Sequence, residues 1–184
     1  MSIMKKIFAI SGSTRTNSSN ARLLKVIAER TADKYEVEIF EGLTFIPHFN
    51  PGLDSETPPE AVTAFREKVK NADGVIICTP EYIFSLPGSL KNALEWMVST
   101  VIFTGKPVGL ITASAHGIKA KEELALIMHT IGARFSDDTQ LLIQGIKGKI
   151  DMDGNITHEE TSIRLGQFLE AFDRSLHESP QATS

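Results

Sequence analysis

Hydrophobic residues along this chain form short continuous runs, separated by longer stretches in which apolar residues recur with helical spacing. The runs have the length of strands, and several are continuously apolar rather than alternating with polar residues. They fall at residues 7–10, 37–40, 75–78, 108–112 and 141–143. Strands that are apolar on both sides are typical of a parallel sheet covered by helices on both faces. The pattern therefore predicts a layered α/β protein with five strands.

Three of the intervening stretches place apolar residues on one helical face, at residues 23–28, 90–97 and 165–176. Thr157 and Glu160 have the spacing of a capping box, which predicts that the last helix begins there. This alternation predicts a single domain over residues 1–178, with a flavodoxin-like doubly wound parallel sheet in the strand order 2-1-3-4-5. The small polar residues 179–184 predict a disordered tail.

Composition narrows the possible partners. The chain has 19 Lys and Arg against 23 Asp and Glu, a net charge of −4, and no basic block, which argues against nucleic acid. No apolar run approaches the roughly 18 residues of a membrane span, and the short N-terminal run predicts a strand rather than a signal peptide. The one cysteine excludes an internal disulfide. A cytoplasmic protein is expected.

The loop after the first strand, residues 11–20, is rich in hydroxyl groups and leads into a helix. Free N–H groups and the positive end of the helix dipole make such a junction an anion site. Arg15 adds a planar cation suited to phosphate oxygens. Gly12 is the only glycine of the loop, so the P-loop and the dinucleotide-binding pattern are both excluded. A phosphate monoester is the predicted ligand, and the alternative is a loop that only caps the helix.

The loop after the third strand, residues 79–88, carries bulky residues that core packing does not require there. Tyr82, Ile83, Phe84 and Leu86 lie at the carboxyl edge of the predicted sheet, where they can form a wall for a flat ring. A phosphate loop beside an apolar wall indicates a nucleotide, and flavin mononucleotide (FMN) fits both parts.

The two loops together resemble those of the NAD(P)H-dependent FMN reductases, a flavodoxin-like family that includes quinone and chromate reductases and some azoreductases. The family's phosphate loop, G-S-x-R-x-x-S-x-N, is matched by Gly12, Ser13, Arg15, Ser18 and Asn20. Its flavin loop, P-E-Y-N-x-S-x-P-G-x-L-K-N-A-[LI]-[DE]-W, is matched over residues 80–96 except at Ile83, which replaces the usual Asn. Residues 113–120 keep only part of the family's glycine-rich third loop.

The resemblance implies a set of FMN-binding residues and no catalytic or metal-binding side chain. Those implied for the phosphate are Ser11, Ser13, Arg15, Ser18, Ser19 and Asn20. Those implied for the ring are Thr79, Pro80, Glu81, Tyr82, Ile83 and Ser85, with Ser114, His116 and Gly117 from the third loop. The long loop 41–59 is expected to shape the open face of the flavin.

The implied activity is transfer of a hydride from NADPH or NADH to FMN, then of two electrons to a small acceptor. The identity of the acceptor stays open among a quinone, free flavin, an azo compound and a metal ion such as chromate. The choice between NADPH and NADH stays open as well. The resemblance also implies a homodimer or homotetramer. Trp96 and Met97 are either core residues or a subunit contact. The alternatives are a flavodoxin-like electron carrier and a flavin-binding sensor without turnover.

Overall fold

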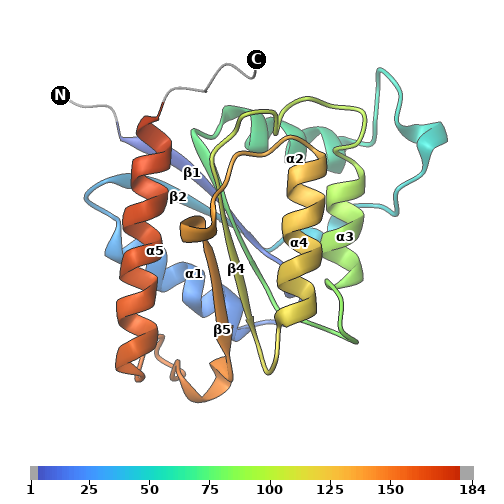
Figure 1. The fold of residues 1–184 in the computed structure, drawn as a ribbon. Helices are drawn as coiled ribbons and strands as arrows, with labels where there is room; N and C mark the ends of the chain where they lie inside the picture. The colour runs from blue at the N-terminus through green and yellow to red at the C-terminus, as the bar shows by residue number, and fades with distance from the viewer. Residues whose placement is uncertain (1–3, 179–184) are drawn as a thin grey trace.

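Five parallel strands form the sheet of the computed structural model, which describes residues 4–178. The strands are β1 (Lys5–Ser11), β2 (Tyr35–Phe40), β3 (Gly74–Thr79), β4 (Val108–Ser114) and β5 (Gln140–Gln144). Their order across the sheet is β2-β1-β3-β4-β5, and every neighbouring pair is parallel (Figure 1). The five predicted strands and their order are thus confirmed. The predicted tail, residues 179–184, lies outside the described residues.

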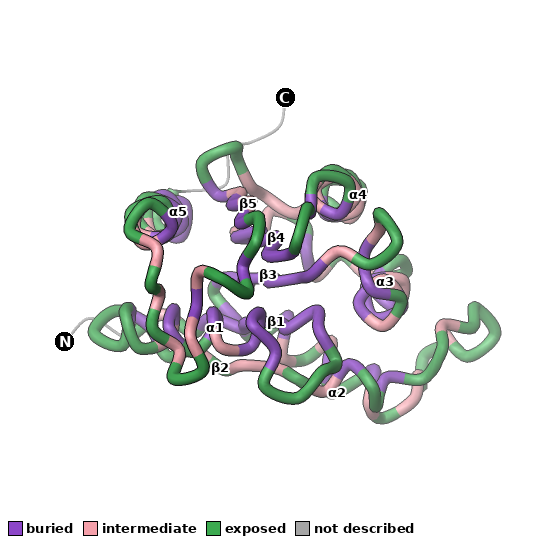
Figure 2. Tube along the Cα trace, turned by 90° about the horizontal axis from the view of Figure 1, so that it is seen from below, coloured by how far each residue is buried: buried purple, intermediate pink, exposed green. Residues whose placement is uncertain are grey.

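Helices cover the sheet on both faces. They are α1 (Ser19–Arg30), α2 (Glu60–Asn71), α3 (Gly88–Glu95), α4 (Ile118–Thr130) and α5 (Glu159–His177). Figure 2 shows α1 and α5 on one side of the sheet and α2, α3 and α4 on the other. Helical spacing identified α1, α3 and α5 but missed α2 and α4. The buried residues of α2 are Val62, Phe65 and Val69, and those of α4 are Ala120, Leu124 and Met128, so both helices carry a stripe that the sequence analysis passed over. Over residues 4–178, no helix combines the length and the apolar character needed to cross a membrane.

Side chains of the central strands alternate between two hydrophobic cores. In β1, Phe8 and Ile10 belong to the core under α2, α3 and α4, while Ile7 and Ala9 belong to the core under α1 and α5. All residues of β3 and β4 are buried. Because both faces of these strands are covered, their sequences read as continuous apolar runs.

Helix α5 begins differently from the prediction. Its N-cap is His158, whose Nδ1 accepts the N–H of Thr161 at 3.3 Å. Thr157 instead belongs to a short hairpin and donates its N–H to the carbonyl of Lys149 at 3.0 Å. The predicted capping box of Thr157 and Glu160 was therefore wrong, because tertiary pairing takes Thr157 out of the cap.

The long loop 41–59 packs on α3. Asn92 donates its amide to the carbonyl of Pro47 at 3.0 Å and accepts the N–H of Phe49 at 2.7 Å. Trp96 also donates to Pro47, at 2.8 Å. These contacts fix the loop at the side of the molecule. They also bury Trp96, so that side chain belongs to the core of this chain.

Candidate functional site

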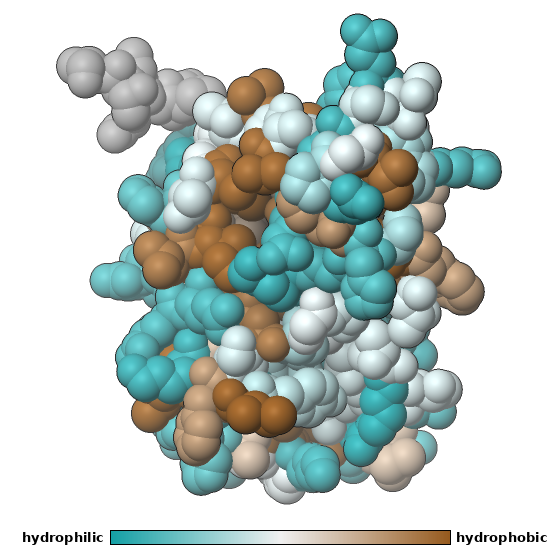
Figure 3. Space-filling model, turned by 90° about the vertical axis from the view of Figure 1, so that its right-hand side faces the viewer, coloured by the Kyte–Doolittle hydropathy of each residue, from teal (hydrophilic) through white to brown (hydrophobic). Residues whose placement is uncertain are grey.

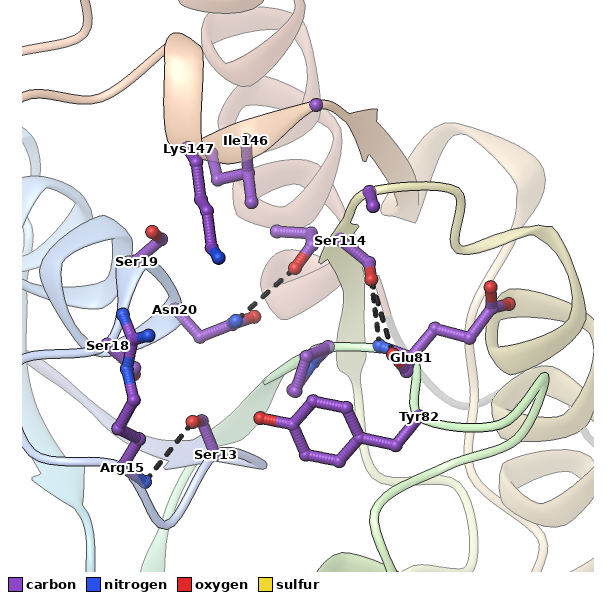
Figure 4. Close-up of a pocket in the computed structure, with 14 residues that line it drawn as sticks. Ser13, Arg15, Ser18, Ser19, Asn20, Glu81, Tyr82, Ser114, Ile146 and Lys147 are labelled. Carbon is purple, nitrogen blue, oxygen red and sulfur yellow. Dashed lines mark hydrogen bonds between the residues drawn. The ribbon is translucent and has the colours of Figure 1, made fainter.

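A pocket of about 330 Å³ lies where the carboxyl ends of β1, β3, β4 and β5 meet (Figure 4). It is lined by Ser13, Arg15, Ser18, Ser19, Asn20, Pro80, Glu81, Tyr82, Ala113, Ser114, Ala115, Gly145, Ile146 and Lys147. The crevice at the carboxyl edge of a doubly wound sheet is where such folds bind ligands, because the connections diverge there. None of the lining residues comes from the long loop 41–59, and the expectation that this loop shapes the open face of the flavin stays a prediction.

The loop between β1 and α1 presents backbone donors to the pocket. Ser18 is the N-cap of α1, and its Oγ accepts the N–H of Ala21 at 3.0 Å. Ser19 and Asn20, the first two helical residues, are buried, and within the described residues their N–H groups have no protein acceptor. Buried backbone donors need a partner, and at a helix N-terminus an anion is a favourable one.

Gly12 lets this loop lie against the end of β3. A Cβ at Gly12 would stand 2.6 Å from the Oγ1 of Thr79, so any side chain would push the loop away. Thr79 and Ser11 are both fully buried and do not line the pocket. The Oγ of Ser11 donates to the carbonyl of Ser13 at 3.3 Å. Ser11 and Thr79, which were both predicted to bind FMN, instead support the phosphate loop from the buried side.

The side chain of Asn20 braces the pocket floor. Its Nδ2 donates to the carbonyl of Ala113 at 3.3 Å, and its Oδ1 accepts the thiol of Cys78 at 3.2 Å. Burial raises the pKa of Cys78, which keeps the thiol protonated as this donor. Asn20 thus joins the ends of β3 and β4 to the start of α1.

Glu81 connects the loop after β3 to the start of α4. Its carboxylate accepts the N–H groups of Gly117 and Ala120, each at 3.0 Å, while its own N–H donates to the Oγ of Ser114 at 3.1 Å. Burial would raise the pKa of Glu81, but these backbone donors outweigh it and hold the pKa below its usual value. The negative charge is therefore satisfied by the helix end and is not presented to an anion in the pocket.

Residues 82–85 form a tight hairpin at the pocket rim. Tyr82 and Ser85 exchange backbone hydrogen bonds of 3.0 and 3.1 Å, and the turn residues Ile83 and Phe84 have φ values of 53° and 56°. Glu123 of α4 accepts the hydroxyl of Ser85 at 2.6 Å and so fixes the hairpin base. The Tyr82 ring faces the pocket (Figure 4). Ile83 is 96% exposed and, like Ser85, does not line it.

The third loop contributes differently from the expectation. Ser114 lines the pocket together with Ala113 and Ala115, whereas His116 is exposed and outside the lining. Gly117 has φ of +90° and caps α4, so it shapes the loop without lining the pocket.

The loop after β5 was missed by the sequence reasoning. Gly145, Ile146 and Lys147 line the pocket, and the N–H of Gly145 donates to the carbonyl of Ala115 at 3.3 Å. The predicted strand order placed the carboxyl end of β5 beside that of β4. This placement was the sequence information that could have identified the segment. The motif patterns stop before this segment.

The chemistry of the pocket suits a ligand with a phosphate group and a flat ring. Over residues 4–178, neither Arg15 nor Lys147 takes part in an ion pair, and Glu81 is occupied by backbone donors. The two cationic side chains lie around the N–H donors at the start of α1 (Figure 4). The Tyr82 ring lies on another side of the pocket (Figure 4). This site on this fold defines the class of flavodoxin-like flavin-binding proteins.

Comparison with known proteins identifies the family. The sequence profile of the NADPH-dependent FMN reductases matches residues 5–147, and the chain belongs to this family. FMN and NAD(P)H are accordingly its cofactor and electron donor. The family resemblance predicted from the two loops is confirmed.

Similar proteins include several quinone reductases. The chain is 30% identical to a 2-hydroxy-1,4-benzoquinone reductase of Burkholderia sp over 173 residues, covering 91% of this chain and 93% of that protein. It is 29% identical to a quinone reductase of Escherichia coli K12 over 179 residues, covering 94% and 95%. The solved structure of the flavoenzyme NAD(P)H:(acceptor) oxidoreductase FerB from Paracoccus denitrificans superposes with a TM-score of 0.83 at 27% identity, covering 95% and 98%.

Proposed function

We propose that this protein holds FMN in the pocket and reduces quinones at the expense of NADPH or NADH. The observation that carries the proposal is the pairing of the α1 N-terminus with the Tyr82 wall in one pocket. The names of the relatives support the choice of quinone among the possible acceptors. NAD(P)H, a quinone and one proton give NAD(P)⁺ and a hydroquinone, which balances electrons and atoms.

In this proposal each loop has a separate task. The N–H groups of Ser19 and Asn20 and the guanidinium of Arg15 hold the phosphate. Tyr82 packs beside the flavin ring, while the backbone at Pro80 and Glu81 and the hydroxyl of Ser114 line its polar edge. Ser13 and Ser18 complete the phosphate cradle. Ser11, Thr79, Ser85 and Gly117 position these loops, and Ile83 and His116 lie at the rim.

Bound FMN supplies the redox chemistry by accepting two electrons from the nicotinamide and delivering them to the acceptor. In this proposal the hydride transfer to the flavin requires no side-chain acid or base, and we assign none.

We also propose that a second copy of the chain covers the groove between α3 and α4. This groove, of about 340 Å³, is lined largely by apolar side chains, and its residues Val98 and Leu126 are 67% and 66% exposed. Figure 3 shows apolar surface gathered around a hollow on this side of the molecule. An exposed apolar groove of this kind is unusual for a monomer.

Light scattering tests the association. Leu126→Glu is expected to convert the wild-type dimer or tetramer to a smaller species. Ile163→Glu, at a 55% exposed residue of α5, is expected to leave the mass unchanged. A wild-type protein that is monomeric at micromolar concentration contradicts the proposal.

We place the protein in the cytosol. Its one cysteine, Cys78, is a free thiol, as is usual in reducing compartments. Fractionation of the producing cells tests this, and recovery in an oxidising compartment contradicts it.

An anaerobic titration tests the main proposal. Purified protein with FMN is expected to lose its flavin absorbance when NADPH or NADH is added, and a quinone is expected to restore it. FMN binding without bleaching indicates the electron carrier or sensor instead. Absence of FMN binding overturns the assignment of the pocket.

A further inference from the structure

The pocket contains a second cation that neither family motif provides. Lys147 lies in the 3₁₀ turn Ile146–Gly148 after β5, far along the chain from the phosphate loop. The phosphate motif supplies only Arg15 as a cation. Lys147 therefore calls for an explanation of its own.

Lys147 and Arg15 approach the same helix end from opposite sides. Figure 4 shows the Lys147 side chain pointing into the pocket toward Ser19 and Asn20, with the Arg15 guanidinium beside Ser18. All of these residues line one pocket. The start of α1 thus lies between two cationic groups.

The segment that carries Lys147 is fixed to α1. Ile146 is buried and anchors the turn in the core under α1 and α5. Arg22 of α1 donates to the carbonyl of Asp151 in the following hairpin and to the Oγ of Ser19, the latter at 3.2 Å. Arg22 therefore contacts both the hairpin that follows the Lys147 turn and Ser19 of the phosphate cradle. This connection limits how far Lys147 can lie from the helix end.

The charge balance favours two cations at this place. A phosphate monoester carries about −1.5 to −2 charges at neutral pH, more than one arginine neutralises. The Glu81 carboxylate is satisfied by Gly117 and Ala120, so no acidic group of the pocket competes for Lys147. Lysine acts on phosphate as a mobile point charge, which complements the planar fork of arginine.

We propose that Lys147 is the second phosphate ligand of FMN, closing the cradle from the side of β5. The inference rests on the proposed function in one respect, that FMN is the ligand of this pocket. It adds a residue from the β5 loop to the two motif loops. It also predicts that this chain recognises the phosphate more strongly than Arg15 alone would allow.

Flavin affinity tests the inference without any enzyme assay. Full-length protein loaded with FMN or riboflavin is diluted serially at low ionic strength, and released flavin is measured by its fluorescence. Lys147→Gln is expected to raise the Kd for FMN about tenfold, the loss of one charge-assisted contact, and to leave that for riboflavin unchanged. Lys147→Arg keeps the positive charge and is expected to bind FMN with the Kd of the wild type. The effect should largely disappear at 1 M salt, where the Debye length is about 3 Å.

Lys149→Gln is the matched control, because it removes the same charge two residues further on, from a side chain that does not line the pocket. An equal effect of Lys149→Gln on FMN affinity would show general electrostatics and overturn the inference. So would an unchanged FMN Kd in Lys147→Gln, or an equal loss for riboflavin, which has no phosphate. A change confined to the KM for NADPH would assign Lys147 to the 2′-phosphate of that donor instead.

The failures can be told apart. If the wild type does not bind FMN, the proposed function fails with the inference. If the wild type binds FMN and Arg15→Gln weakens it while Lys147→Gln does not, only the inference fails.

Discussion

The two motif loops lie at the same edge of the sheet, yet they differ in backbone strain. The phosphate loop has one non-glycine residue with positive φ, Asn17 at 53°, and Asn tolerates that conformation. The hairpin at 82–85 has two, Ile83 and Phe84, and a β-branched residue there is a genuine outlier. Both are highly exposed, so burial does not offset the strain. Under the proposed function the FMN phosphate is thus held by a loop with relaxed backbone, and the strained residues lie at the rim of the pocket.

Among the substitutions that test this comparison, Arg15→Gln is expected to have the largest effect. Losing its charged contacts should cost roughly 1.5–3 kcal/mol of FMN binding, or about tenfold to a hundredfold in Kd. Folding should be unaffected, because Arg15 is exposed. Fluorescence titration measures the Kd, and Arg164→Gln on α5 is the control. An unchanged affinity in Arg15→Gln would mean that the loop only caps α1.

Glu81→Gln tests how firmly the strained loop is tied to α4. The amide leaves one of two backbone donors without an acceptor, which should cost about 1–2 kcal/mol of unfolding free energy. The pKa of Glu81 is lowered in the folded state, so its contribution is present above the ordinary value of 4.5 and is lost as the pH falls through the folded pKa.

Urea unfolding of wild type and Glu81→Gln at several pH values measures this difference. It should be largest near neutral pH and shrink below pH 4.5. A difference that stays constant across that range would show that the carboxylate charge contributes nothing.

Ile83→Asn should stabilise the protein by about 1 kcal/mol, because Asn relieves part of the left-handed strain. Thermal unfolding measures the gain. Ile83→Val keeps the β-branch and serves as the control, with no gain expected. If both variants unfold at the wild-type temperature, the hairpin carries no strain that matters to folding.

Asn17→Ala is the corresponding substitution in the phosphate loop, and it is expected to have the smallest effect on stability. Alanine is less comfortable at this φ, so we expect a loss of roughly 0.5 kcal/mol. Opposite signs for Asn17→Ala and Ile83→Asn would support the contrast between the two loops. A stabilised Asn17→Ala would break it.

Local pattern was sufficient for the centre of the sheet because β3 and β4 are buried along their whole length and therefore read as apolar runs. It also located Arg15 and Tyr82, because the ends of parallel strands converge whatever the details of packing. Lys147 was missed because its segment carries no motif, and its place depends on the hairpin held by Arg22. His158 replaced Thr157 at the α5 cap for a similar reason, since pairing with Lys149 is decided by tertiary structure.

Glu81 shows most clearly what the sequence alone could not predict. The motif marks the residue, and the resemblance implies a place beside the flavin ring. Only the fold brings its carboxylate to Gly117 and Ala120, which are distant in the chain. The start of α4 is thus capped by a carboxylate that comes from another loop.

The burial of Cys78 has a consequence for the proposed reduction of quinones. Quinones are electrophiles that alkylate thiolates, and a thiolate is the reactive form of cysteine. The single sulfhydryl of this chain is fully buried, protonated and hydrogen-bonded to Asn20. Under the proposed function the protein therefore offers quinones no reactive thiolate, and we expect Cys78 to stay unalkylated during repeated exposure to them.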